Sequence, residues 1–167
     1  MPLFVGFVPT HPQHVDAFFE IAPLTSSDVV YDLGSGDGRL VFACLGQGAG
    51  KAVGVELDRK LIKKARDTAR ERGLENRASF VQSDVTEVDL TGASVVFCYL
   101  TPQASAALKP KFEHELKAGT RVVIESFPIP GWKPAQTTAR GYADYYEINE
   151  FFLYVMPATP SDQGIGL

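Results

Sequence analysis

A glycine-rich turn and two later carboxylates are the residues of this sequence whose types and spacing can do chemistry. Residues 31–39 read YDLGSGDGR, and Glu56 and Asp84 each follow a later apolar run. Glycines permit a tight turn and let a ligand approach the backbone closely. Glu56 is placed to accept hydrogen bonds from both hydroxyls of a ribose, and Asp84 to accept one from an adenine amino group. The pattern therefore predicts a site for a nucleoside.

Each of these features stands at the end of an expected strand, which is how they could meet in space. Apolar runs predict strands over residues 28–31, 51–55, 78–81, 94–99 and 120–125. Helices are expected over residues 12–22, 39–46, 59–72 and 102–116, the last with a kink or break at Pro110. Strands that alternate with helices form a parallel sheet covered on both faces, and such sheets bind ligands at the carboxyl ends of their strands.

The pattern changes after the fifth expected strand. Residues 127–134 hold three prolines and a glycine, which excludes a helix there. Two further strands are expected over residues 137–147 and 150–156, joined by a turn at Ile148–Asn149. We expect a single domain over residues 1–157 and a disordered tail over residues 158–167, which are rich in small and turn-forming residues.

The glycine turn distinguishes between cofactor classes. The dinucleotide fingerprint needs a third glycine three positions after the second, and that position, counted from Gly36, is Arg39. Asp32 and Asp37 would also repel a pyrophosphate. No Gly-Lys-Ser/Thr follows the turn, which excludes a P-loop. S-adenosylmethionine carries an ammonium and a sulfonium and no phosphate, so an acidic loop suits it, and it is the predicted cofactor.

Composition limits the other possibilities. The chain has 167 residues, 45% of them hydrophobic, and a formal net charge of −4 that disfavours a global attraction to nucleic acid. Cys44 and Cys98 lie in apolar segments, which is typical of buried thiols in a reducing cytoplasm. No apolar run approaches the roughly 18 residues of a membrane span, and the N-terminus lacks the basic region of a signal peptide. These features predict a cytoplasmic protein.

Four stretches carry a resemblance to class I S-adenosylmethionine-dependent methyltransferases. They read FVPT (residues 7–10), YDLGSGDGR (31–39), GVEL (54–57) and FPIPGW (127–132). Together they resemble the seven-strand protein lysine methyltransferases, a group that holds a small archaeal broad-specificity enzyme and mitochondrial relatives acting on lysines of ATP synthase or of a nucleotide carrier. The resemblance implies an α/β, Rossmann-like seven-strand sheet, mostly parallel, with an antiparallel C-terminal hairpin and helices on both faces.

The resemblance also implies roles for individual residues. The glycine loop would hold the methionine part of the cofactor, Glu56 the ribose and Asp84 the adenine. The implied cofactor-binding residues are Asp32, Gly34, Ser35, Gly36, Gly38, Glu56, Leu57, Asp84 and Val85. Tyr99, Thr101 and Thr10 would lie at the reacting end as candidate catalytic residues.

Two histidines depart from the pattern of the group. His11 stands where the group usually has proline, and His14 stands at a position that is usually apolar. Their spacing would suit a metal, but no third ligand lies nearby in the sequence, so no metal site is expected.

Methyl transfer from a sulfonium is an in-line displacement that needs alignment and desolvation rather than a strong base. An acceptor lysine must lose a proton from a group whose pKa is about 10.4, and an apolar slot would lower that value. Tyr99, Thr101, Glu125 and Thr10 are candidates for orienting the amine, while packing in the core is the alternative for Tyr99 and Glu125. Phe127 and Trp132 could line a lysine channel or simply pack in the core.

Two other functions stay open at this point. The first is a methyltransferase acting on a small molecule or RNA, although residues 99–102 read YLTP and lack the motif of nucleic-acid amino methyltransferases. The second is a module that binds the cofactor without catalysis. The basic run over residues 59–66 is either a solvated helix face or a docking surface for an acidic partner or RNA. The expected partner is a protein with an accessible lysine, and no feature predicts an oligomeric state.

Overall fold

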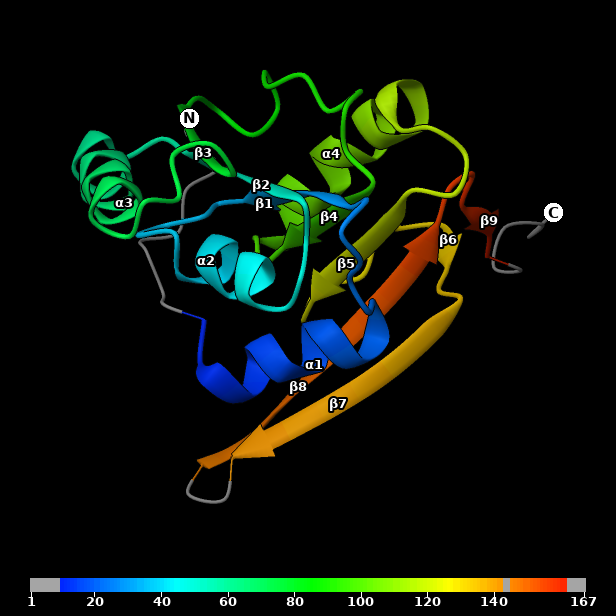
Figure 1. Ribbon diagram of the computed structural model, residues 1–167. Helices are drawn as coiled ribbons and strands as arrows, with labels where there is room; N and C mark the ends of the chain where they lie inside the picture. Colours follow the sequence, from blue (N-terminus) through cyan, green and yellow to red (C-terminus); the bar gives the residue numbers. More distant parts are fainter. Residues whose placement is uncertain (1–9, 143–144, 162–167) are drawn as a thin grey trace, which may run out of the picture.

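Seven strands form one mixed sheet at the centre of the protein, in the order β3-β2-β1-β4-β5-β8-β7 (Figure 1). The computed structural model describes residues 10–142 and 145–161. The strands are β1 Val29–Leu33, β2 Lys51–Glu56, β3 Ala78–Gln82, β4 Val95–Cys98, β5 Arg121–Glu125, β7 Gln136–Tyr142 and β8 Tyr145–Val155. Strands β1 to β5 pair in parallel, and β8 is antiparallel to both β5 and β7. The expected mostly parallel sheet with an antiparallel C-terminal hairpin is confirmed.

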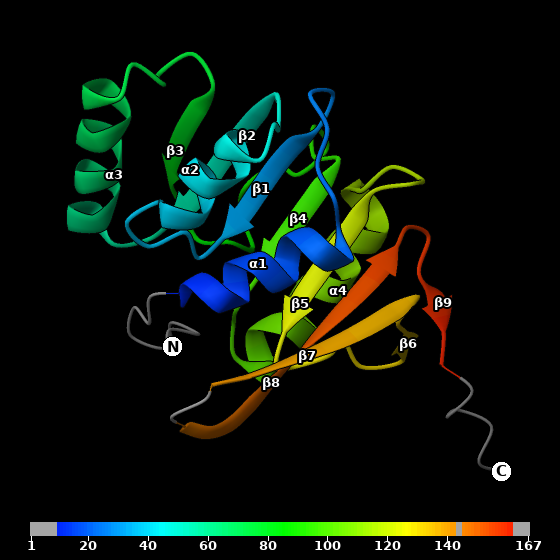
Figure 2. The same cartoon turned by 60° about the horizontal axis from the view of Figure 1, so that its bottom comes forward.

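Helices cover both faces of the sheet, as expected (Figure 2). Buried side chains of α1 (Pro12–Ile21), α2 (Arg39–Gly46) and α3 (Arg59–Glu71) share one apolar cluster with one face of the strands. Helix α4 (Pro102–Glu115) packs on the opposite face. No helix in the described part of the chain combines the length and the apolar character that a bilayer span requires.

Helix α4 runs through Pro110 without ending there, so the expected break does not occur. Proline removes one backbone hydrogen bond, to the carbonyl four residues earlier. Both Pro110 and Ala106 are exposed, and water can therefore satisfy that carbonyl. The segment between β5 and β7 contains no helix, which confirms the expectation from its prolines.

The predicted turn at Ile148–Asn149 is wrong, because β8 continues through both residues. Tyr142 pairs with Tyr145, so the hairpin reverses between them. Asn149 pairs with Arg140 of β7, and its side-chain amide donates to the side chain of Glu125 on the neighbouring strand β5. Period-two patterning could not show this contact between segments far apart in the sequence.

The expected start of a disordered tail at residue 158 is too early. Thr159–Pro160 forms strand β9, which pairs with β6 (Trp132–Lys133) in a separate two-stranded sheet. The amide of Ser161 also donates to the carbonyl of Gly131. Residues 162–167 lie outside the described residues.

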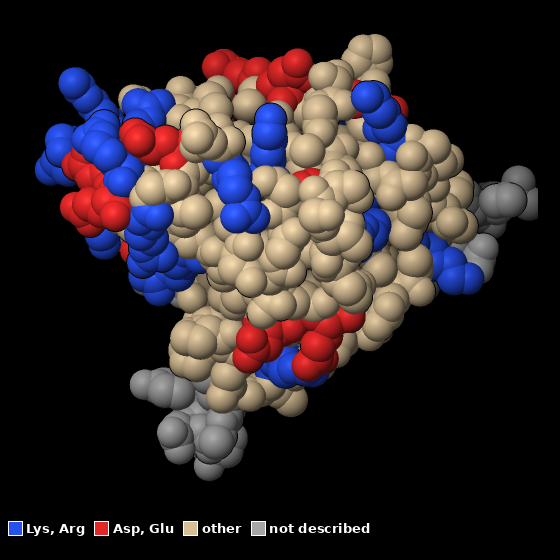
Figure 3. Space-filling view, in the orientation of Figure 1, with Lys and Arg blue, Asp and Glu red and all other residues tan. Residues whose placement is uncertain are grey.

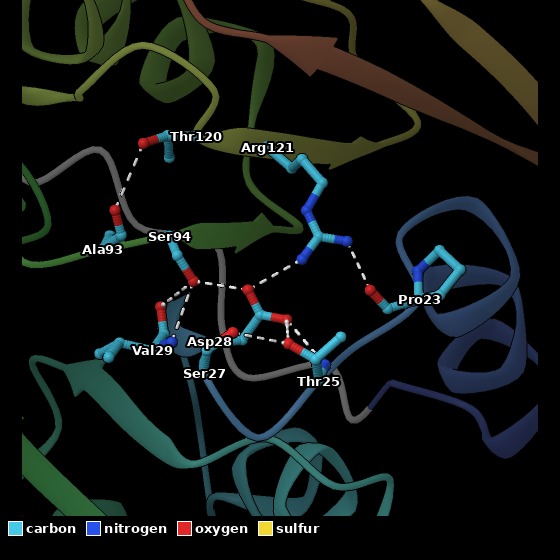
Figure 4. Close-up of polar contacts among 9 residues, drawn as sticks. All are labelled: Pro23, Thr25, Ser27, Asp28, Val29, Ala93, Ser94, Thr120 and Arg121. Carbon is cyan, nitrogen blue, oxygen red and sulfur yellow. Dashed lines mark hydrogen bonds and ion pairs between the residues drawn. The ribbon is translucent and has the colours of Figure 1, made fainter.

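A network of polar groups ties the amino end of the sheet together (Figure 4). Asp28 Oδ1 accepts hydrogen bonds from Ser94 Oγ at 2.8 Å and from Arg121 at 2.9 Å. Its Oδ2 accepts from the backbone and hydroxyl of Thr25 at 2.7 and 3.2 Å. Although burial opposes ionisation, these donors and the Arg121 charge together hold the pKa of Asp28 below its ordinary value. Both oxygens of this carboxylate are therefore fully engaged within the fold.

Candidate active site

The glycine turn after β1 has the conformation that the sequence predicts. Gly34, Gly36 and Gly38 have φ angles of 88°, 55° and 83°, which side chains rarely adopt. A Cβ at Gly38 would also lie 2.7 Å from the ring of Phe80. The amides of Gly34 and Ser35 donate to the carbonyl of Val55, so the turn is held against the end of β2.

Glu56, the last residue of β2, organises this turn from the neighbouring strand. Its side chain is buried, and Oε2 accepts from the amide of Gly36 at 3.0 Å. Its Oε1 accepts from the amides of Leu57 at 2.8 Å and Asp58 at 2.9 Å. One carboxylate thus joins the glycine turn to the start of α3, and its remaining lone pairs can accept from hydroxyl groups of a ligand.

Asp32 gives the base of the turn its electrostatic character. Its carboxyl is buried, and burial together with the nearby charge of Glu56 raises its pKa from 3.8 to about 7. A bound cation would favour the ionised form of this group. The hydroxyl of Ser35 is also buried and has no hydrogen-bond partner among the described residues. A pyrophosphate would be repelled here, whereas the ammonium and sulfonium of S-adenosylmethionine fit.

The sequence suggests that Asp37 adds negative charge to the cofactor site, but in the structure cationic side chains of the protein pair with it. Its carboxylate forms ion pairs with Arg39 at 3.0 Å and with Lys64 at 3.4 Å. These contacts lower its pKa and balance its charge, so Asp32 and Glu56 are the acids that shape the turn.

The adenine-binding residues that the sequence predicts follow β3. Asp84 Oδ1 accepts from the backbone and hydroxyl of Thr86 at 2.8 and 2.7 Å, which closes a turn at this point. Val85 is buried beneath the turn, whereas Leu57 is 39% exposed. The predicted cofactor residues therefore all lie at the carboxyl ends of three adjacent parallel strands, β1, β2 and β3.

The predicted catalytic residues lie beyond β4 and before α1. Tyr99 follows β4 and is 36% exposed, and Thr10 is partly exposed two residues before α1. Thr101 is the N-cap of α4, and its hydroxyl accepts from the amide of Ala104 at 3.2 Å. The Thr101 side chain thus has a structural role in starting the helix.

A polar cluster, made of the buried His14 and Glu125 and the partly buried Asn149, lies at the carboxyl end of β5. His14 Nδ1 lies 2.6 Å from Glu125 Oε1, and Asn149 Nδ2 donates to the same oxygen at 2.8 Å. Glu125 has no exposed surface, and burial raises its pKa to about 7 despite the Asn149 hydrogen bond. Burial, with the nearby His11, lowers the pKa of His14.

Sequence reasoning names Glu125 as a candidate but misses its two partners. A signal for His14 exists, because a histidine stands where the resembling group is usually apolar. Asn149 reads as a turn residue and carries no such signal. His14 pairs with a carboxyl group, and no group of three potential metal ligands exists among residues 10–142 and 145–161.

Comparison with known proteins agrees with this geometry. Residues 32–136 match the family described as the ANTKMT methyltransferase domain. A protein-lysine N-methyltransferase of Saccharolobus islandicus (strain REY15A) is 43% identical over 133 residues, covering 79% of this chain and 83% of that protein. The adenine nucleotide translocase lysine N-methyltransferase of Mus musculus is 36% identical over 110 residues, covering 66% of this chain and 48% of that protein.

One solved structure is similar to this protein over nearly the whole length of both chains. It is described as an RNA methyltransferase from Salinibacter ruber in complex with S-adenosyl-L-homocysteine. It has a TM-score of 0.82 and 35% identity, and covers 93% of this chain and 97% of that one. From the acidic glycine turn, the seven-strand sheet and these matches we conclude that the chain belongs to the ANTKMT methyltransferase domain family and is an S-adenosylmethionine-dependent methyltransferase.

Proposed function

We propose that this protein is a protein lysine N-methyltransferase. The observation that carries the proposal is a pair of buried carboxyl groups on one edge of the sheet, Asp32 beside the glycine turn and Glu125 at the end of β5. Both reactants are cations, since the cofactor carries an ammonium and a sulfonium and the acceptor is a lysine ammonium. An edge with a carboxyl group for each of them suits this pair of reactants. The archaeal and mouse relatives, both described as lysine N-methyltransferases, support the proposal.

Each part of the site has a task in this reaction. S-adenosylmethionine supplies, when bound, a methyl group already activated on its sulfonium. We assign the ammonium end to Asp32 and the glycine turn, the ribose to Glu56 with Leu57, and the adenine to Asp84 with Val85. Tyr99 and Thr10 are assigned to the acceptor end, where they would align the amine and exclude water.

The proposal includes a cytoplasmic location and a protein partner with an accessible lysine. Cys44 and Cys98 are free and buried, and burial raises the pKa of both thiols. Unpaired buried thiols suit a reducing compartment, which supports this location.

RNA is the second candidate acceptor, because the Salinibacter ruber relative is described as an RNA methyltransferase. Lysines and arginines gather over α3 (Figure 3), where Arg59, Lys63, Arg66 and Arg70 line a groove. Acidic groups interrupt this surface, however, since Asp67 pairs with both Lys63 and Arg70. The net charge of −4 adds to the disadvantage for a polyanion, so lysine is the favoured acceptor.

The acceptor is identified by transfer of radiolabelled methyl from S-adenosylmethionine into a cell lysate that is then divided between protease and nuclease. We expect label that protease removes and that appears as methyl-lysine after acid hydrolysis. A lysate whose lysines have been acetylated is the matched control and should accept little label. Label removed by nuclease, or label unaffected by acetylation, would reject the lysine acceptor. The variant Glu56→Ala is the control for cofactor-dependent transfer.

A further inference from the structure

We propose that Glu125 is a catalytic residue whose Oε2 receives the acceptor ammonium and takes its proton, while His14 and Asn149 hold the carboxyl group through Oε1. This inference rests on the proposed function and deepens it. It identifies a proton acceptor in a site where the sequence shows no convincing base.

The two oxygens of Glu125 have unequal surroundings. Oε1 contacts His14 Nδ1 at 2.6 Å and Asn149 Nδ2 at 2.8 Å. Oε2 is buried and has no hydrogen-bond partner among the described residues. A buried polar atom without a partner costs free energy and is rare in native structures. An ammonium that reached Oε2 would supply the missing donor, so the unequal pattern points to a ligand with N–H groups.

Three elements fix the orientation of this carboxyl group. Glu125 ends β5, Asn149 lies on β8 and His14 lies on α1, which packs across the sheet beside them. The His14 ring also contacts Phe151 edge-on, with 5.6 Å between ring centroids. Asn149 Nδ2 can only donate, and we assign the Nδ1–H of a neutral His14 as the second donor to Oε1. Oε2 is thereby left available for the acceptor.

The cluster and the cofactor turn lie on the same face of the sheet. Val30 of β1 and Val123 of β5 pack in the apolar cluster under α1. Side chains alternate along a strand, so Asp32 and Glu125, two residues further on, point to this same face. Strand β4 separates β1 from β5. Two strand spacings amount to about 10 Å across the sheet, which leaves room for a methyl group and an amine between the two carboxyl groups.

The proton step balances within this cluster. One N–H bond of the lysine ammonium breaks and one O–H bond forms at Oε2. The nitrogen lone pair that is released would form the bond to the methyl carbon while the carbon–sulfur bond of the cofactor breaks and leaves its electron pair on sulfur. Glu125 becomes a neutral acid. Its proton leaves to water after the product departs. A carboxyl group with a pKa of about 7 can exchange protons at neutral pH, as general bases do.

The groups that surround Glu125 define what else could titrate with it. Among the described residues, α1 contributes His14, with His11 6.1 Å from it between ring centroids. Strand β8 contributes Asn149, which does not titrate. Strand β4 pairs with β5 as far as Cys98 and Ile124, and the titratable side chain of Tyr99 follows directly after this pair. A pH profile of the variants below therefore separates Glu125 from the two histidines.

The test compares Glu125→Gln with Asp28→Asn, a matched buried carboxylate at the opposite end of the sheet. Both proteins are assayed for methyl-lysine formation, for S-adenosylmethionine binding by calorimetry and for thermal unfolding. We expect Glu125→Gln to lower kcat by about 100-fold or more, the usual range for a lost general base. Its cofactor Kd should stay within about twofold of wild type, and Asp28→Asn should keep a wild-type kcat. The unfolding curves show whether each variant is folded.

The pH dependence of kcat distinguishes a catalytic role of Glu125 from a structural one. Loss of a purely structural contact would leave the shape of this pH profile unchanged. Wild-type kcat should rise with pH and bend near pH 7, where Glu125 ionises. Glu125→Gln should lose this bend, and Glu125→Asp should recover part of the rate. His14→Gln, which acts on a positioning residue, should lower kcat by about 10-fold and shift the bend.

Three results decide the matter. Loss of kcat and of the bend in Glu125→Gln, with wild-type cofactor binding, supports the inference. Equal methyl-lysine formation by wild type and Glu125→Gln overturns the inference and leaves the proposed function standing. Absence of methyl-lysine with the wild-type protein on every acceptor overturns the proposed function, and the inference falls with it.

Discussion

The two ends of strand β5 carry buried carboxyl clusters that are built in opposite ways. At the amino end, Arg121 pairs with Asp28, and both Asp28 oxygens accept hydrogen bonds. At the carboxyl end, Glu125 has two donors on one oxygen and none among the described residues on the other. The pKa of Asp28 is lowered, whereas that of Glu125 is raised to about 7.

The two kinds of carboxyl group affect the stability of the folded protein in opposite ways. A carboxylate whose donors and charge partner lie within the fold stabilises the native state when ionised. A carboxylate that is buried without a full set of donors destabilises it, and its free capacity is available to a ligand. The polar groups at the amino end of the sheet are therefore structural, whereas those at the carboxyl end are the ones we assign to substrate binding.

The largest effect is expected on cofactor affinity at the carboxyl end. Glu56→Ala removes a group that accepts three backbone amides and, in our assignment, both ribose hydroxyls. We expect the Kd for S-adenosylmethionine to rise by about 5- to 150-fold, or about 1–3 kcal/mol, as measured by calorimetry. Asp28→Asn is the control from the amino end. An unchanged Kd in Glu56→Ala would refute the ribose assignment.

The next effect concerns the dependence of stability on pH. Burial raises the pKa of Glu125 from 4.5 to about 7, so between these pH values the folded protein binds a proton that the unfolded chain has released. The stability that this group contributes is present below pH 4.5 and is lost as the pH rises through 7. Glu125→Gln should therefore raise the free energy of unfolding by about 2 kcal/mol at pH 8.5 and by little at pH 5.

Denaturant unfolding at the two pH values measures this difference. A Glu125→Gln protein that is less stable than wild type at pH 8.5 would show that the ionised carboxylate is satisfied within the fold. The contrast between the two ends of β5 would then be lost.

A smaller effect of the opposite sign is expected at the amino end. Asp28→Asn removes the charge that pairs with Arg121, and we expect a loss of about 1–2 kcal/mol in the free energy of unfolding at pH 8. Because the pKa of Asp28 is lowered below 3.8, this deficit should shrink only as the pH falls below that value. A double-mutant cycle with Arg121→Met measures the coupling. A coupling of zero would mean that the pair contributes nothing.

The smallest expected effect is on stability at Thr101, where two variants distinguish a helix-capping role from a catalytic one. Thr101→Ala removes the N-cap of α4 and should lower the free energy of unfolding by about 1 kcal/mol. Thr101→Asn keeps a cap but has no hydroxyl, and should keep both stability and kcat. A Thr101→Asn protein of wild-type stability that has lost its activity would make Thr101 a chemical residue like those proposed at this end.

Much of the fold follows from local pattern. Apolar runs that end at Asp32, Glu56 and Gln82 mark β1, β2 and β3, and the polar N-cap Asp58 starts α3. The glycine turn is equally visible, because its backbone angles admit few other residues. These features depend on neighbours within a few positions, which a sequence displays directly.

The features that could not be predicted depend on distant partners. Asn149 looks like a turn residue until Glu125 is seen on the adjacent strand. Pro110 looks like a helix break until its solvent exposure is known. The sequence could not show that Asp37 pairs with Lys64 instead of facing the cofactor, because Lys64 lies 27 positions away.

The position of β8 between β5 and β7 has a consequence for synthesis of the chain. The cofactor cradle that we propose uses residues 32–85, which leave the ribosome before β8. His14 and Asn149 are 135 positions apart, and the contact of Asn149 with Glu125 forms only when β8 has paired with β5. A nascent chain could therefore hold its methyl donor before it can accept a substrate proton. Pairing of such distant segments is slow relative to local folding, so we expect the Glu125 cluster to complete after the cofactor cradle.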